Sequence, residues 1–509
     1  MAARKFKKIL AVAGLILADV FLVHTLVLSW KDVSLGTGGV AFRALFKGVL
    51  QAHAADIDGN GIEDITGVFS DEPYPRKYIL KCFSPFLPMG HQPVGYFFED
   101  LALVNQTVLH PIDLEGGASL EIPIVEIVDG SEMVLRTRNS KGEETGVRRF
   151  SLGQWNGYTS FDAFLDDLDA DGGPELVATF KDFWNQRLLG CHGIVAYDVR
   201  SGRRLWEYAL GTQPLTKRVA DVDGDGRKEI VVCGWGAHNG MSANGTDDDH
   251  SYIIVLDSGG RELWKKELGY YYTMISFDIG DVDGDGHLEI VTGKSCHRAF
   301  DPDAAELKIL DAATGREERA LSREGYSYTS VSLVRTKDGG RMVAAGDSKG
   351  GLTLFDGNLR PVRQVRYESP IKVIGAAVLG EEGAARDYLF VRVGERVLEV
   401  LTPALKRIHR EELDVAGREF DAGIVPVRNG REHALALTAD TLYLVREQNG
   451  GFLRLLASVF VSRFAALLLV LIVLNGLAFG RGIGGSARRV EGGGAGGMTG
   501  VVQEIAHRM

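Results

Sequence analysis

Four nine-residue segments place oxygen-bearing side chains at positions one, three, five and nine, with glycine at position six. Alternate positions let three side chains converge on one ion, and carboxylate and amide oxygens favour Ca²⁺ over transition metals. The sequence therefore predicts four calcium loops, holding two to four ions. The candidate ligands are Asp56, Asp58, Asn60 and Asp64; Asp167, Asp169, Asp171 and Glu175; Asp221, Asp223, Asp225 and Glu229; and Asp281, Asp283, Asp285 and Glu289.

Two other interpretations of these loops can be considered. An EF-hand also needs a bidentate glutamate at position twelve. That position holds Gly67, Ala178, Val232 or Thr292, so we reject an EF-hand. Plain acidic hairpin turns without a metal remain the alternative, and we favour it for a degraded fifth copy that begins at Asp113.

The loops recur at a regular spacing that predicts a repeat protein. The starts at 167, 221 and 281 lie 54 and 60 residues apart, and the degraded copy fills the interval between 56 and 167. Near residues 333, 379 and 425 the acidic motif is missing, but a turn followed by a strand recurs at the same spacing. This spacing divides the chain into eight repeat units that average about 53 residues.

Each unit contains four short strand-like runs separated by glycine-rich turns. In the unit around the 281 loop, strands are expected over 273–279, 289–293 and 306–310, followed by a last strand. Four short antiparallel strands at such a period are typical of β-propeller blades. We predict an all-β protein in which residues 31–452 form a propeller of seven or eight blades, with eight favoured by the count.

Two apolar segments predict membrane helices on either side of the propeller. Residues 9–28 follow a basic stretch, residues 1–8, and residues 455–479 precede a glycine-rich tail, 480–509, that carries three arginines from position 481 to 489. A 20-residue helix spans about 30 Å, the thickness of a bilayer core. The positive-inside rule then places both termini in the cytoplasm and the propeller in the periplasm or outside the cell. Each predicted span contains an ionisable residue, Asp19 in the first and Arg463 in the second. Two arrangements stay open: the two side chains pair within the bilayer, or the Arg463 side chain extends to the bilayer surface.

Composition argues against nucleic acid as a partner. The 509 residues carry a formal net charge of −11, whereas nucleic-acid binding draws its affinity from a basic face. The four cysteines form no C-x-x-C motif, which excludes a zinc ribbon or a thioredoxin-type site.

The acidic loops resemble the FG-GAP/VCBS repeats of integrin-α-type β-propellers, whose pattern is D-x-[DN]-G-[DN]-G-x-x-[DE]-[LIV]. The likeness is strong over roughly residues 40–300 and extends to 450 only as a repeating frame. It implies calcium loops between the first two strands of a blade, ligands at the opposite face, and a binding or adhesion module rather than an enzyme. The chain departs from the family in its two predicted anchors and in its last three units, which lack the calcium motif.

The later strands also resemble quinoprotein-type blades, in which a tryptophan packs between blades. Asp311 to Gly315 match the turn of that pattern, and Trp206 and Trp264 match the tryptophan position. This resemblance bears on the fold alone, because a quinone-dependent dehydrogenase is expected to carry adjacent cysteines. Cys82, Cys191, Cys233 and Cys296 are all isolated.

Three long loops, 181–193, 236–251 and 294–305, follow the second strand of successive units and are expected opposite the calcium loops. Long loops on one end of a rigid scaffold commonly carry binding sites. The candidate functional residues on or next to these loops are Trp184, Cys191, His192, Trp235, His238, Asp247, Asp248, Asp249, His250, Cys296 and His297. The two Cys-His pairs leave three interpretations open: a metal site, a Cys191–Cys296 disulfide, or separate structural thiols.

These features favour a membrane-tethered, extracytoplasmic propeller that recognises a protein or glycan. No nucleophile–base set or nucleotide-binding motif is found, so we do not expect an enzyme. Two alternatives stay open: a quinoprotein-like enzyme that uses the central funnel, and a structural subunit of an envelope assembly or transport complex. An exposed aromatic and apolar patch on the long-loop side would favour the binding module.

Overall fold

The computed structural model describes residues 39–448, with the exception of the segments given next. These exceptions are 71–77, 87–97, 102–105, 115–118, 154–160, 182–191, 237, 239–240, 271, 296–304, 324–326, 337–338, 383–385, 413–422 and 439–440. The chain divides into two compact units, 1–449 and 450–509, and all described residues belong to the first. The predicted spans 9–28 and 455–479 lie outside the described residues. Within the part that is described, no helix has the length and apolar character needed to cross a bilayer.

The described residues are all-β and contain no α-helix, as the sequence predicts. Six separate sheets have four antiparallel strands each, paired in chain order. Sheet 1 contains β2 (Val49–Ala55), β3 (Asp64–Ser70), β4 (Tyr78–Phe83) and β5 (Phe98–Leu101), and sheet 2 contains β6 (Gln106–Val108), β7 (Ile122–Val128), β8 (Glu132–Arg138) and β9 (Glu144–Ser151). Sheet 3 contains β10 (Phe161–Asp166), β11 (Glu175–Phe180), β12 (His192–Asp198) and β13 (Arg204–Leu210), and sheet 4 contains β14 (Gln213–Ala220), β15 (Glu229–Trp235), β18 (His250–Leu256) and β19 (Glu262–Tyr270). Sheet 5 contains β20 (Met274–Gly280), β21 (Glu289–Ser295), β22 (Ala305–Asp311) and β23 (Glu317–Arg323), and sheet 6 contains β24 (Tyr328–Arg335), β25 (Arg341–Asp347), β26 (Gly351–Phe355) and β27 (Pro361–Arg366).

Two further sets of four strands are joined at one corner. Set 7 contains β28 (Ile371–Glu381), β29 (Arg386–Val393), β30 (Val397–Leu401) and β31 (Arg407–Glu412). Set 8 contains β32 (Gly423–Asn429), β33 (Glu432–Thr438), β34 (Thr441–Gln448) and the first strand of the chain, β1 (Gly39–Lys47). The corner is the pairing of Gly380 and Glu381 in β28 with His433 and Glu432 in β33.

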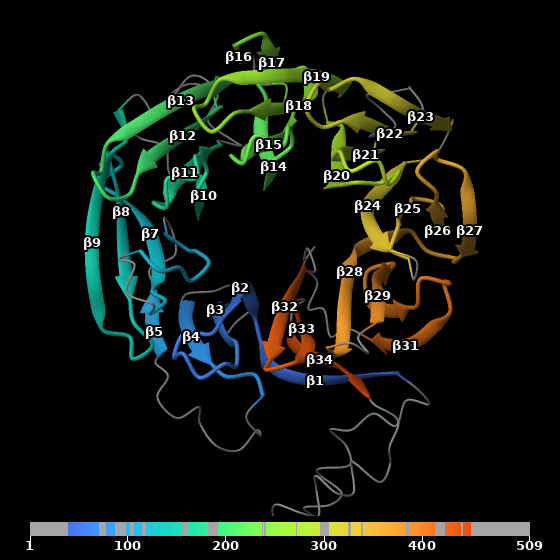
Figure 1. Cartoon of the computed structure of the whole chain (residues 1–509), viewed down its shortest axis with the longest axis horizontal. Coiled ribbons are helices and arrows are strands. Elements are labelled where there is room, and N and C mark those ends of the chain that lie inside the picture. Colours follow the sequence, from blue (N-terminus) through green and yellow to red (C-terminus); the bar gives the residue numbers. More distant parts are fainter. Residues whose placement is uncertain are drawn as a thin grey trace, which may run out of the picture. The chain divides into compact units, whose positions relative to one another are not determined.

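The first strand thus completes the last set from the opposite end of the sequence. β1 pairs with β34 in an antiparallel register that runs from Gly39↔Gln448 to Lys47↔Thr441. Figure 1 shows the sheets of the first unit following one another around a ring, with β2, β10, β14, β20, β24, β28 and β32 on its inner side. Pairing across the two ends of the chain covers the edge of β34 and supplies the fourth strand of the last set from the start of the chain.

The hydrophobic core lies between neighbouring sheets. The second and third strands are the most buried: every residue of β3, β11 and β26 is buried, whereas the outer strand β27 is almost entirely exposed. One cluster joins Val177 and Ile194 of sheet 3 to Ile230 and Ile254 of sheet 4, and similar clusters join other neighbours. Strands that neighbouring sheets cover on both faces have continuous runs of apolar, often β-branched, residues in their sequence. This burial explains the apolar segment after each acidic loop.

The expected tryptophan positions are confirmed as contacts between sheets. Trp206 in β13 donates a hydrogen bond from its indole N–H to the Ser258 carbonyl in the next sheet, at 2.9 Å. Trp264 in β19 makes the same bond to the Ala312 carbonyl, also at 2.9 Å. Gly260 and Gly315, which have positive φ, lie so close to these rings that an added Cβ would approach within 2.3 and 2.6 Å.

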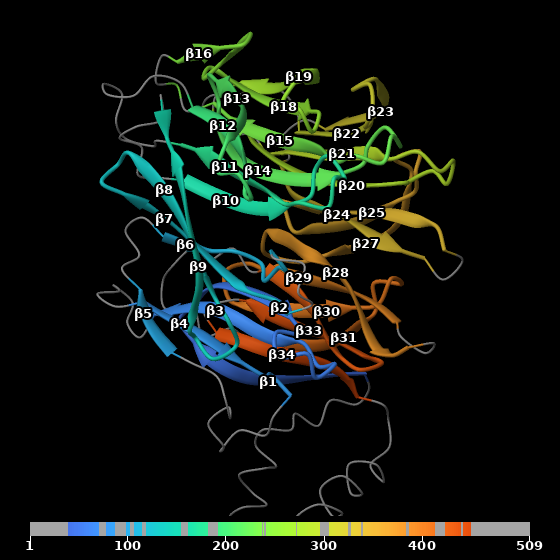
Figure 2. The same ribbon diagram turned by 60° about the vertical axis from the view of Figure 1, so that its left-hand side comes forward.

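The antiparallel order sends alternate turns to opposite ends of each sheet. We call the end that carries the first-to-second and third-to-fourth strand turns the metal-loop face, and the end that carries the second-to-third turns the long-loop face. The long loop of sheet 4 contains a small hairpin, β16 (Ser242–Ala243) and β17 (Thr246–Asp247). Figures 1 and 2 both show β16 outside the outer strands β13 and β19. The side chain of Asn244 fixes the hairpin to the Ala209 carbonyl at 3.0 Å.

Candidate metal sites and the long-loop surface

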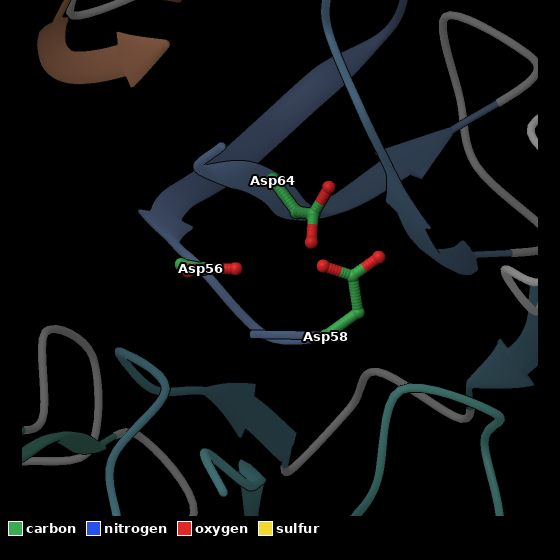
Figure 3. Close-up of side chains that lie close together, drawn as sticks. All are labelled: Asp56, Asp58 and Asp64. Carbon is green, nitrogen blue, oxygen red and sulfur yellow. The ribbon is translucent and has the colours of Figure 1, made fainter. Parts of the chain in front are cut away.

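All four acidic segments form the connection between the first and second strands of a sheet. They follow β2, β10, β14 and β20 and lead into β3, β11, β15 and β21. The position-nine residue is in each case the first residue of the second strand, so it is fixed by the strand pairing. Figure 3 shows the carboxylates of Asp56, Asp58 and Asp64 around a common space at the first of these connections.

The structure brings three carboxylates of each loop together, with ligand atoms within 4.8 Å of one another. The groups are Asp56, Asp58 and Asp64; Asp167, Asp169 and Glu175; Asp221, Asp223 and Asp225; and Asp281, Asp283 and Asp285. Asp171, Glu229 and Glu289 are predicted ligands that lie outside these groups of three. Asn60 donates from its side chain to Asp58 at 2.9 Å.

Backbone N–H groups hold the loop carboxylates in place. The position-one carboxylate accepts from the position-six amide in every loop, for example Gly226 to Asp221 at 3.0 Å and Gly286 to Asp281 at 3.1 Å. The position-three and position-five carboxylates each accept from an amide two residues later, as Asp225 does from Arg227 at 2.8 Å. Loop amides thereby orient the carboxylates, and in the loops of Asp56, Asp221 and Asp281 both oxygens of the position-one carboxylate accept such an amide.

The glycine at position six has the left-handed conformation that the sequence predicts, with φ between 82° and 90° in the four loops. A Cβ added at these glycines would have no atom within 4 Å, so the backbone angle and not lack of space requires them. Position four has positive φ as well, which the sequence reasoning missed. Glycine occupies it in three loops, and Ala170, with φ 61°, occupies it in the sheet 3 loop. Recurring glycine at position four was the available signal.

The position-nine glutamates are buried next to the acidic clusters. Glu175, Glu229 and Glu289 each accept the amide of position two, at 2.8, 2.8 and 2.6 Å. Burial raises the pKa of each to about 7, and repulsion from the neighbouring loop aspartates adds to the rise. Positive charge at the cluster would offset both effects, because it stabilises the ionised carboxylates.

The residues present fit a calcium ion. The donors are oxygens alone, as hard divalent cations prefer, and no thiol or imidazole joins the four groups. In the sheet 3 loop, Asp167 Oδ1 is buried and has no hydrogen-bond partner among the described residues. A buried carboxylate oxygen without a partner costs free energy unless a cation or another donor satisfies it. Asp113 and Glu121 of the degraded copy join no such group within the described part of the chain.

Aromatic and apolar side chains lie on the long-loop face at the ends of sheets 4 and 5. Trp235, at the end of β15, contacts Tyr272 with ring centroids 5.5 Å apart. His250 lies 5.3 Å from the ring of Tyr270. Tyr270 and Met274 are among the few large apolar side chains that are exposed, at 40% and 50%. The sequence predicts the loops of this surface but not Tyr270, Tyr272 or Met274, which come from the β19–β20 connection.

Polar groups of the same loop surround these rings. His250 Nδ1 lies 2.7 Å from Asp247 Oδ1, and His238 contacts Asp249. Asp248 is buried, and its backbone carbonyl accepts the His238 amide at 2.9 Å. The described residues of this predicted binding loop therefore form a polar rim beside an aromatic cluster.

The other candidates on the long loops are only partly described. His192 is buried at the start of β12, at 2% exposure, so it does not present its side chain at the surface. Trp184, Cys191, Cys296 and His297 lie outside the described residues, as does any Cys191–Cys296 disulfide. Cys82 and Cys233 are buried free thiols, and burial raises the pKa of each to about 12.

Comparison with known proteins supports the repeat and the fold. Residues 221–292, which include two of the acidic loops, match the FG-GAP-like repeat family. No curated protein matches the chain. Among solved structures, Sqt1 of Saccharomyces cerevisiae is 12% identical, with a TM-score of 0.50, over 81% of this chain and 100% of that one. The Dos1 propeller is 10% identical, with a TM-score of 0.49, over 80% of this chain and 94% of that one.

The rhamnogalacturonan lyase YesW is also similar, at 14% identity and a TM-score of 0.49, over 81% of this chain and 74% of that one. Identities this low bear on the fold alone. Together with the ring of four-stranded sheets, the comparisons show that this chain has a β-propeller fold with FG-GAP-like repeats.

Proposed function

We propose that this protein is an eight-bladed, calcium-binding propeller, tethered to the cytoplasmic membrane by the segments 9–28 and 455–479, that binds a protein or glycan outside the cytoplasm. The blade number rests on the six four-stranded sheets and the two further sets of four strands. The calcium sites rest on the converging carboxylates of four loops and on the buried oxygen of Asp167. We propose a binding protein and not an enzyme.

The exposed aromatic and apolar surface at the ends of sheets 4 and 5 is the observation that carries the binding function. Tyr270 and Met274 keep large apolar areas in water, although most side chains of their size are buried elsewhere in the described chain. Aromatic rings and methionine are enriched where proteins bind partners, because they bury large areas at low conformational cost. The neighbouring histidines and aspartates would supply hydrogen bonds at the rim of such an interface.

The binding function is tested by capture with the full chain in native membranes. Photo-crosslinking at Met274 identifies the partner, and affinity is then measured for the double variant Tyr270→Ser, Met274→Ser. We expect a loss of at least about tenfold, because central aromatic contacts commonly contribute about 2 kcal/mol or more. The matched control is Val362→Thr, which removes an exposed apolar side chain, at 51% exposure, from the outer strand β27. Equal affinity of the double variant and the control would refute the proposed surface.

Membrane insertion and calcium are tested separately. Alkaline carbonate should leave the full chain in the membrane, whereas a chain that lacks both apolar segments should be released. Calorimetric titration with Ca²⁺ should give two to four sites, and Asp221→Ala with Asp281→Ala should remove two of them. Release of the full chain would refute the tether, and a titration without binding heat would refute the calcium sites.

A further inference from the structure

We propose that the metal-loop face lies flat against the lipid bilayer, so that its exposed basic turns contact anionic lipid headgroups and the long-loop face points away from the membrane. This inference rests on the proposed membrane tether and adds an orientation to it.

Both chain ends leave the propeller at one point. Gly39, the first residue of β1, pairs directly with Gln448, the last residue of β34. The segments 1–38 and 449–509 therefore start side by side on the outermost pair of strands in set 8. The two predicted anchors are therefore joined to the propeller through neighbouring residues, Gly39 and Gln448.

This exit point lies on the metal-loop face. β34 runs antiparallel to β33, so its last residue lies at the end of set 8 where the β32–β33 turn is found. That turn is bonded to the acidic loop of sheet 1: Ile62 pairs with Asn429, and Arg428 donates its amide to Glu63 Oε2 at 2.7 Å. The Arg428 carbonyl accepts the Glu63 amide at 2.9 Å.

The chain between the exits and the predicted spans is short. Six residues, 449–454, separate Gln448 from the second apolar segment and reach at most about 20 Å when fully extended. Ten residues, 29–38, separate the first apolar segment from Gly39 and reach at most about 35 Å. A seven-residue strand is about 23 Å long, so the long-loop face at set 8 is a full strand length further along the sheet than the exits.

Basic turns on the same face favour a flat over an edge-on orientation. The third-to-fourth strand turns of five successive sets each end in an exposed cation, and these are Arg203, Arg261, Arg316, Arg360 and Lys406. All five lie on the metal-loop face, on sets that extend around the ring away from the exits.

Two of the five cations contact carboxylates and still remain open to solvent. Arg261 lies 3.0 Å from Asp257, and Arg316 lies 2.7 Å from Glu318, yet their side chains are 79% and 69% exposed. Bound calcium would offset part of the carboxylate charge on this face. Lipid phosphates are complementary to an array of exposed guanidinium and ammonium groups.

The orientation is tested by energy transfer to the membrane surface. The full chain, with Cys191→Ser and Cys296→Ser, carries one donor dye at Arg431→Cys, Asn358→Cys or Glu395→Cys. It is reconstituted with calcium into vesicles that contain an anionic phospholipid and a headgroup-labelled acceptor. Arg431 lies on the metal-loop face beside the exits, Asn358 lies on the same face in sheet 6, and Glu395 lies on the long-loop face.

We expect transfer at Arg431 and Asn358 to exceed transfer at Glu395 by at least about threefold, because one strand length separates the two faces. High transfer at Arg431 with low transfer at Asn358 would indicate an edge-on ring and overturn the inference, as would equal or higher transfer at Glu395. In vesicles without anionic lipid, transfer at Asn358 should fall at least about twofold. An unchanged value would overturn the assignment of anionic headgroups.

The same samples separate this inference from the tether. A chain that carbonate releases from the vesicles refutes the tether and the orientation together. A chain that stays in the membrane with its long-loop face towards the lipid refutes the orientation alone.

Discussion

The substitution Asp223→Asn should change the stability of this protein in opposite directions with and without calcium. Asp223 is exposed, and one of its oxygens accepts the Asp225 amide at 3.1 Å, a bond that the asparagine oxygen can also accept. Its carboxylate lies within 4.8 Å of those of Asp221 and Asp225. Without a cation these charges repel one another, and with a cation they bind it.

The two effects can be given magnitudes. In chelator, each of the two neighbouring carboxylates, about 4.8 Å away, repels that of Asp223 by about 0.9 kcal/mol in water, so the asparagine should raise the free energy of unfolding by up to about 2 kcal/mol in low salt. In calcium at about 100 times the dissociation constant, each site contributes about 2.7 kcal/mol. Loss of one carboxylate ligand should remove most of that contribution, which exceeds the repulsion relieved and gives a net destabilisation of about 1 kcal/mol.

Urea unfolding of wild type and variant, each in about 10 mM Ca²⁺ and in chelator, measures both numbers. The matched control is Asp113→Asn in the degraded copy, which should have the same effect in the two buffers. If Asp223→Asn shifted the midpoint in the same direction in both, the loop would be an acidic turn without a bound ion, and the reasoning would be wrong.

Three further substitutions test the fold and its titratable groups. Ala170→Gly should raise the free energy of unfolding by about 1 kcal/mol, because it relieves a left-handed alanine, and thermal unfolding measures it. Gly260→Ala should cost at least about 2 kcal/mol more than Gly430→Ala in the same assay, since both have positive φ but only the first places a Cβ against Trp206. Burial, assisted by a neighbouring histidine, lowers the pKa of His53 to about 4. The unfolded chain then binds a proton that the folded chain does not, so stability should fall by at most about 3 kcal/mol as the pH drops from 6.5 to about 4, and His53→Gln should remove that slope.

The acidic loops and their strands could be predicted because both depend on side chains close together in sequence. Nine residues contain the converging oxygens, the glycine that bends the loop and the first residue of the next strand. The strands expected over 273–279 and 289–293 are found as β20 (Met274–Gly280) and β21 (Glu289–Ser295). The positions of single carboxylates were harder to predict: Glu229 and Glu175 accept equivalent backbone amides, yet only Glu175 joins a group of three.

The sequence by itself determined the repeated four-strand unit, the spacing of the oxygen ligands and the two apolar segments, because each depends on the order of residue types within one short stretch. Only the tertiary structure decided that β1 closes the last set against β34, that Gly39 and Gln448 meet on the metal-loop face, and that Tyr270 and Met274 remain exposed beside Trp235 and Tyr272. These features join residues that are distant in the chain. Burial and ring closure are properties of the whole packed ring, so no local pattern specifies them.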